Sequence, residues 1–251
     1  MSLNHKRRGT AKQEETEQED LDQLLKKINN KKNCKINFGN FCKELQSIEA
    51  DSERGEGVDF SADRKKGAVE LGFRDKACLL RTLPLEKDLC FIALCDEAGF
   101  YRKNKRGRYS ADLLGLWRNR KTTKLAVVEL KAGRNGDSLL YAVAEGLRNL
   151  YIAWLSLKRL ENRWEKTCPK KTKESWGEST PFQKLAKKKA QLVIIGDHSW
   201  AKKTQQKEDK KIIKRKPITI GKLEIEVSIY SFANGAKSRS KPYALLPLRK
   251  I

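Results

Sequence analysis

Two carboxylates and a lysine lie in neighbouring apolar segments of the chain, where charged side chains are unusual. Asp112 lies in residues 110–117 (SADLLGLW), and Glu129 and Lys131 lie in residues 125–131 (LAVVELK). Charged groups within apolar segments cost free energy unless a partner or a metal ion compensates them. An Asp, a Glu and a Lys that converge on one face of a sheet could support metal-dependent hydrolysis of a phosphodiester bond.

The segments that carry these residues are predicted to form a β-hairpin. Residues 108–117 and 124–131 are rich in Leu, Val, Tyr and Trp, and the polar residues 118–123 separate them. Two apolar runs joined by a short polar link are typical of paired antiparallel strands.

The register of this hairpin decides whether the three charged groups meet. If the turn centres between Arg120 and Lys121, Asp112 falls opposite Glu129. Because side chains alternate between faces, Asp112, Glu129 and Lys131 then share one face. A shift of one residue would place Asp112 on the other face.

The chemistry expected of the cluster depends on a divalent cation. The carboxylates of Asp112 and Glu129, with the backbone carbonyl of Leu130, are hard oxygen ligands that suit Mg²⁺ or Mn²⁺. Lys131 would orient or deprotonate a water molecule, or stabilise charge on the phosphate. The alternative is an ordinary Glu–Lys pair at a strand end, with Asp112 at an exposed edge.

The motifs ADLLGL and VVELKAGR, followed by a glycine-containing loop and a long helix, resemble the PD-(D/E)XK nuclease superfamily. Within it they are most similar to the catalytic domains of archaeal and bacterial branched-DNA and mismatch endonucleases. The resemblance covers about residues 88–160 and extends to about 232, but it is absent from the first sixty residues.

This resemblance implies an α/β fold with a restriction-endonuclease-like core, in which a mixed central sheet is flanked by helices and carries basic insertions. The family core is a helix, three meandering strands, a helix and a further strand. By motif, Asp112 and Glu129 would be metal ligands and Lys131 the catalytic lysine. Ser110 and Ala111 stand where the family often has Pro or Gly.

A long amphipathic helix follows the hairpin. Asp137 and Ser138 can cap its start. Its apolar residues recur at spacings of three and four, which gives a stripe wide enough to pack on a sheet: Leu139, Val143, Leu147, Leu150, Trp154 and Leu157. Many family members carry a Gln in this helix, and Glu145 is the nearest residue here. Glu145 is either an extra catalytic group or a solvated helix residue.

The charge of the chain favours a polyanionic partner. Fifty-five Lys and Arg against 32 Asp and Glu give a formal net charge of +23 among 251 residues. Such an excess promotes nucleic-acid binding, although it also suits a ribosome-associated protein or an anionic membrane. We expect nucleic acid, with DNA favoured over RNA. The predicted contacts are Arg102, Lys103, Lys105, Arg106, Arg108, Arg134 and Arg148.

The rest of the chain is predicted more coarsely. Residues 1–20 form a disordered tail, 21–60 a helical extension and 61–251 the nuclease-like domain, with Lys-rich insertions at about 164–190 and 199–216. Short helices are expected at 21–29 and 41–48, strands at 89–95, 191–196 and 223–230, and either type of element at 66–85.

The sequence has no apolar run of about 18 residues and no charged-then-apolar leader, so we expect a cytoplasmic protein without a membrane partner. The six cysteines lack a C-x-x-C motif, and we expect neither disulfides nor an iron–sulfur cluster. A homodimer would suit cleavage of two strands, although no residue indicates one.

The favoured function is a metal-dependent DNA endonuclease in repair or in defence. One alternative is a nucleic-acid-binding module of the same fold without activity. Another is a basic protein that docks on ribosomes or a larger complex. The sequence leaves open DNA against RNA, the preferred structure or sequence, and endonuclease against exonuclease activity.

Overall fold

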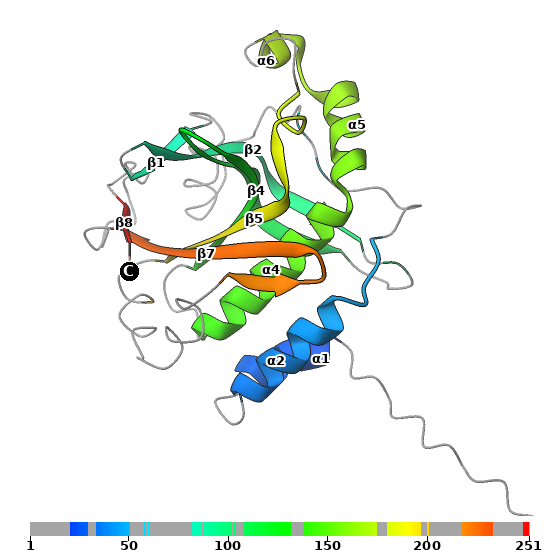
Figure 1. The fold of residues 1–251 in the computed structure, drawn as a ribbon, viewed down its shortest axis with the longest axis vertical. Helices are drawn as coiled ribbons and strands as arrows, with labels where there is room; N and C mark the ends of the chain where they lie inside the picture. Colours follow the sequence, from blue (N-terminus) through cyan, green and yellow to red (C-terminus); the bar gives the residue numbers. More distant parts are fainter. Residues whose placement is uncertain are drawn as a thin grey trace, which may run out of the picture.

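The computed structural model describes residues 21–29, 34–50, 58, 60, 82–86, 88–101, 103, 108–131, 138–174, 180–196, 200, 217–232 and 248–250. Their fold is α/β, with a mixed β-sheet and helices packed against it (Figure 1). No helix in these ranges is long and apolar enough to cross a membrane.

The sheet has eight strands in the order β1-β2-β3-β4-β5-β7-β6, and β8 also pairs with β7. The strands β1 to β4 form an antiparallel meander, whereas β4, β5 and β7 run parallel. Their bounds are β1 Thr82–Glu86, β2 Leu89–Phe100, β3 Tyr109–Asn119, β4 Thr123–Lys131, β5 Leu185–Gly196, β6 Ile218–Ile220, β7 Leu223–Phe232 and β8 Leu248–Lys250.

The helices are α1 Leu21–Asn29, α2 Cys34–Leu45, α4 Leu139–Leu155, α5 Leu157–Thr167 and α6 Lys170–Glu174. The central helix, α4, packs against β2 to β5, and α1 and α2 pack against α4 (Figure 1). The helix α4 is therefore enclosed between the sheet and the N-terminal helices. This explains why it is buried almost all round instead of along one stripe.

The hydrophobic core occupies both faces of the sheet. Val127 of β4 joins the cluster that also contains α4 and α1, whereas its neighbours Ala126 and Val128 join a second cluster. Parallel strands that are covered on both faces read as continuous apolar runs, as β4 and the second half of β5 do.

The structure confirms the predicted hairpin, the helix that begins after Ser138 and the short helix at 21–29. The helix predicted at 41–48 was misplaced, because α2 spans Cys34–Leu45. Its buried residues Phe38, Phe41 and Leu45 follow helical spacing, which the polar residues around Phe38 obscure in the sequence.

The predicted strands are present but longer, since β2 extends to Phe100 and β5 begins at Leu185. The tract at 164–190 contains the end of α5, all of α6 and the start of β5, so it is not simply a polar loop. The predicted tail at 1–20 and the tract at 201–216 lie outside the described residues, as does most of 66–85.

The N-terminal helices share the core of the sheet domain. Leu21, Leu24, Leu25 and Ile28 of α1 are buried in the same cluster as the apolar face of α4. The helical segment predicted as an extension therefore packs as part of the α/β unit.

Candidate active site

The β3–β4 hairpin has the register that brings Asp112 and Glu129 together. Leu113 pairs with Val128, so continuation of the ladder places Asp112 opposite Glu129, as predicted. The ladder pairs end at Leu113, and the Asp112 carboxylate instead accepts a hydrogen bond from the Leu130 backbone N–H at 2.7 Å. Asp112 is thus held directly on the strand that carries Glu129.

The turn of the hairpin accounts for this register. Asn119 Oδ1 accepts hydrogen bonds from the backbone N–H groups of Lys121 and Thr122, at 2.9 and 2.7 Å. The Asn119 N–H also donates to the Thr122 carbonyl at 3.0 Å. An Asn side chain that binds the backbone in this way stabilises a tight turn and so discourages strand slippage.

Glu129 is buried, with 3% of its surface exposed. Asn149 of α4 donates from Nδ2 to Glu129 Oε1 at 2.8 Å and to the Ser110 carbonyl oxygen at 2.9 Å. A single amide from the helix thus bridges both strands of the hairpin. This contact limits the orientations open to the Glu129 carboxylate.

The surroundings of Glu129 oppose its ionisation. Burial raises the pKa of Glu129 well above its usual value, and the charges of Asp112 and Glu145 raise it further. Lys131 and the hydrogen bond from Asn149 act in the opposite direction. The three carboxylates and Lys131 therefore lie close enough to influence one another electrostatically.

Lys131 contacts α4 through Glu145. The Lys131 ammonium lies 2.6 Å from Glu145 Oε2, and the exposed fractions of the two side chains are 7% and 23%. The ammonium also lies 5.9 Å from the centre of the Tyr141 ring. Glu145 is therefore partly buried and paired with the lysine of the cluster. We call Asp112, Glu129, Lys131 and Glu145 the candidate catalytic cluster.

One ridge of α4 supplies the contacts to this cluster. Tyr141, Glu145 and Asn149 follow one another at intervals of four residues, which places them on one face of the helix. Gly146 lets this face approach the sheet. A Cβ atom at Gly146 would lie 2.4 Å from Leu192 Cδ1 and 3.0 Å from Glu129 Cγ.

Three of the residues predicted to bind nucleic acid lie within the described part of the chain, and each of them contacts another group of the protein. Arg148 is 7% exposed; it lies over the Tyr109 ring at 4.1 Å and pairs with Asp22 of α1 at 3.1 Å. Lys103 pairs with Glu49 at 2.8 Å, and the Arg108 guanidinium donates to the Glu97 carbonyl. Arg102, Lys105, Arg106 and Arg134 lie outside the described residues.

The burial of Arg148 makes a direct phosphate contact from this side chain unfavourable. Its guanidinium already has a carboxylate partner and an aromatic face, and both would have to be given up. Sequence reasoning placed Arg148 one turn from Glu145 but could not anticipate Asp22, which comes from a helix far away in the chain.

Asn149 was also missed by sequence reasoning. It is fully buried and follows Glu145 by one helical turn. The available signal was a polar amide among the apolar residues of this helix segment, because buried polar groups need partners. Its Oδ1 is buried and has no hydrogen-bond partner among the described residues.

The donor set suits a hard divalent cation, although it is not a complete protein cage. Within the described ranges no three His, Cys, Asp or Glu side chains are arranged as a metal site. Mg²⁺ commonly uses only one or two carboxylates and keeps several waters. Asp112 and Glu129 provide such a pair, and a cation between them would relieve the repulsion that raises the pKa of Glu129.

Leu130, predicted as a backbone ligand, lies between Glu129 and Lys131 on β4, and its N–H is bound by Asp112. Comparison with known proteins adds no family assignment: no protein-family model, curated protein or solved structure matches the chain.

Proposed function

We propose that this protein is a metal-dependent nuclease that hydrolyses phosphodiester bonds through the candidate catalytic cluster. The observation that carries the proposal is the convergence of Asp112, Glu129 and Lys131 at adjacent positions of β3 and β4, with Glu145 of α4 paired to the lysine. These groups suit phosphoryl chemistry, and the burial of Glu129 and Lys131 is costly for the fold alone.

Asp112 and Glu129 would hold Mg²⁺ or Mn²⁺, with the Leu130 carbonyl as a further oxygen donor. When bound, the cation would polarise the scissile phosphate and lower the pKa of a water molecule.

The protein's own groups position the reactants. Asn149 orients the Glu129 carboxylate, and the Leu130 N–H orients that of Asp112. Glu145 holds the Lys131 ammonium, which is well placed to stabilise negative charge on a phosphate oxygen or to orient the attacking water. Because Lys131 and Glu129 are almost fully buried, these electrostatic interactions are screened less than they would be at the surface.

The order of elements supports assignment to the PD-(D/E)XK superfamily. The chain runs α2, the four-stranded meander β1–β4, α4 and then β5 beside β4, which is the order that the motif resemblance implies with one additional strand, β1. The superfamily assignment and its restriction-endonuclease-like core remain part of this proposal. The net charge of +23 favours nucleic acid as the substrate. DNA in repair or defence is the substrate that the motif resemblance implies.

Cleavage assays with matched variants test this function. Purified protein is incubated with supercoiled plasmid and with single-stranded oligonucleotides in Mg²⁺, Mn²⁺ or EDTA. We expect cleavage in either metal and none in EDTA.

Asp112→Asn and Lys131→Ala should each lower the rate by about 100-fold or more. The controls Asp88→Asn and Lys121→Ala change exposed residues of the β1–β2 and β3–β4 connections and should leave the rate unchanged. Cleavage that survives Asp112→Asn or Lys131→Ala would exclude this mechanism.

A second candidate function is nucleic-acid binding without hydrolysis. The Lys131–Glu145 pair and the Asp112–Leu130 hydrogen bond satisfy these charges within the protein, as a structural network would. Binding without cleavage in both metals would favour this function.

A further inference from the structure

The parallel pairing of β4 and β5 contains a large irregularity close to a group of lysines. The register shifts between Thr123 and Leu125 of β4, so that two steps along β4 face five steps along β5. The extra residues lie within 186–189, and none of them pairs with a residue of β4. We call this segment the lysine bulge, after Lys187, Lys188 and Lys189.

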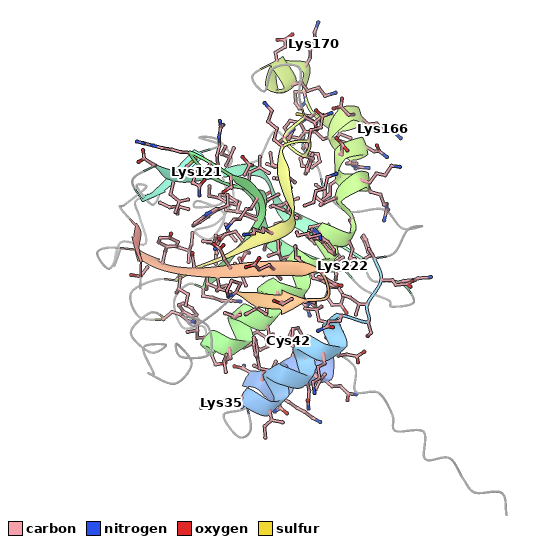
Figure 2. The ribbon with its side chains drawn as sticks, viewed as in Figure 1. Lys35, Cys42, Lys121, Lys166, Lys170 and Lys222 are labelled. Carbon is pink, nitrogen blue, oxygen red and sulfur yellow. The ribbon has the colours of Figure 1, made fainter. Side chains whose placement is uncertain are left out.

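The lysines of the bulge face solvent. All three are exposed, and Lys189 lies 3.8 Å from Glu224 of β7. Lys187 and Lys188 form no ion pair with any described residue. In Figure 1 this part of β5 rises toward the end of the molecule formed by α5 and α6, and Figure 2 shows Lys166 and Lys170 pointing outward there.

The backbone of the bulge is anchored to α4. Trp154 donates from Nε1 to the Lys187 carbonyl oxygen at 2.9 Å, and its ring stacks on that of Tyr151 with 5.7 Å between centroids. Tyr151 is itself buried. The lysines therefore project from a fixed backbone, so little backbone entropy would be lost when they bind a ligand.

Lys189 faces Glu224 across the β5–β7 ladder, but neither burial nor strand pairing explains Lys187 and Lys188 beside it. Like charges on adjacent side chains repel, and Lys is a poor strand former. A β-bulge commonly redirects side chains toward a functional surface. The ammonium groups of Lys187 and Lys188, which have no carboxylate partner among the described residues, are suited to contact the phosphates of a nucleic acid.

We infer that the lysine bulge binds the sugar–phosphate backbone of a double-stranded nucleic acid, at a distance from the candidate catalytic cluster. This inference rests on the proposed function in one respect: it takes the candidate catalytic cluster as the place where the nucleic acid would be cleaved. Glu129 pairs with Ile194, six residues along β5 from Lys188. At roughly 3.3 Å per residue, the two contacts lie about 20 Å apart. A duplex holds its phosphates at fixed separations over this span, whereas a single strand would have to be ordered first.

Equilibrium binding without metal tests this inference. The variant Lys187→Gln/Lys188→Gln is compared with Lys26→Gln/Lys43→Gln, which removes the same charge from exposed positions on α1 and α2. Fluorescence anisotropy in EDTA follows a labelled duplex of about 20 base pairs and a single strand of equal length over a range of salt concentrations. For the duplex, the bulge variant should bind on the order of tenfold more weakly, with a log–log salt slope smaller by about 2. The control should bind the duplex as the wild type does.

Equal duplex affinities of the bulge variant and the wild type would overturn the inference, as would an equal loss in the control. A loss for the single strand as large as for the duplex would overturn the assignment to double-stranded nucleic acid. Lys residues also hinder unwanted strand pairing. A bulge variant that aggregates but binds duplex normally would therefore contradict the inference. A bulge variant that binds phosphatidylserine vesicles more weakly than the wild type, but binds the duplex equally well, would also contradict the inference.

These outcomes are separable from the fate of the proposed function. Bulge-dependent binding by a protein that never cleaves would reject the nuclease proposal alone. If the protein cleaves nucleic acid but the bulge variant and the wild type bind the duplex equally well, this inference alone would be rejected.

Discussion

At the scale of single residues, the cluster combines a carboxylate that resists ionisation with a lysine that is held in place. Glu129 is buried beside Asp112 and Glu145, and all three contributions raise its pKa. Lys131 pairs with Glu145, which has the greater access to solvent. Without a cation, the ionised form of Glu129 is therefore costly to the folded protein.

This arrangement predicts a pH dependence of stability in the metal-free protein. Because the pKa of Glu129 is higher in the folded state, folding is favoured by its protonation. The stabilisation is complete below the unfolded pKa and is lost as the pH rises through the folded pKa. Between these two values, each pH unit should remove about 1.4 kcal/mol from the free energy of unfolding.

Urea unfolding in EDTA, followed from about pH 5 to about pH 8, measures the effect. Glu129→Gln cannot titrate, so its free energy of unfolding should fall less than that of the wild type over the same range. Parallel pH profiles for the two proteins would show that Glu129 is not destabilised by ionisation.

At the scale of elements, the site depends on the close approach of α4 to β4. Gly146 permits this approach, since a Cβ atom there would meet a methyl group of Leu192 and the Glu129 side chain. Tyr141, Glu145 and Asn149 on the same helix then reach Lys131 and Glu129. The helix α4 therefore contributes both to the hydrophobic core and to the contacts of the cluster.

Two Gly→Ala substitutions distinguish the effect of close helix–sheet packing on stability from the effect of helix propensity. Gly146→Ala should lower the free energy of unfolding by about 1–3 kcal/mol, because the added methyl group is overpacked. Gly39→Ala in α2 is the matched control, since a Cβ atom there meets nothing within 4 Å. It should stabilise the protein by up to about 1 kcal/mol. Denaturant unfolding measures both, and a stabilising Gly146→Ala would contradict the close packing described above.

The elements also show what the sequence can and cannot predict. The hairpin register was predictable because Asn119 and the alternation of β3 and β4 act locally. The contacts of Asn149 and the Asp22–Arg148 pair were not, because they depend on how distant segments pack. The start of α2 was missed because polar residues interrupt its apolar spacing.

At the scale of the whole molecule, the N-terminal helices are fastened to the element that carries the site. Asp22 of α1 binds Arg148 of α4 and accepts a hydrogen bond from the Tyr109 hydroxyl at 3.3 Å. At the other end of α1, Asn29 Oδ1 accepts from the Ser138 N–H at 3.1 Å, next to the start of α4. These contacts, with the shared core, make α1 a structural support of the candidate catalytic cluster.

This support predicts that α1 unfolds together with the sheet. Leu25→Ala should lower the free energy of unfolding by about 2–5 kcal/mol, since the side chain is 5% exposed within the common core. Tryptophan fluorescence and far-ultraviolet circular dichroism should give one coincident transition. An early transition confined to helical signal would show that α1 and α2 fold separately from the sheet.

The central claim is that Asp112 and Glu129 together hold a divalent cation beside Lys131. Calorimetric titration of Mn²⁺ into the full-length protein tests it most directly. One saturable site is expected in the wild type and in Lys131→Met, and binding should be weakened by at least about tenfold in Asp112→Asn and in Glu129→Gln. Equal Mn²⁺ affinity in all four proteins, or no saturable binding by the wild type, would contradict the account.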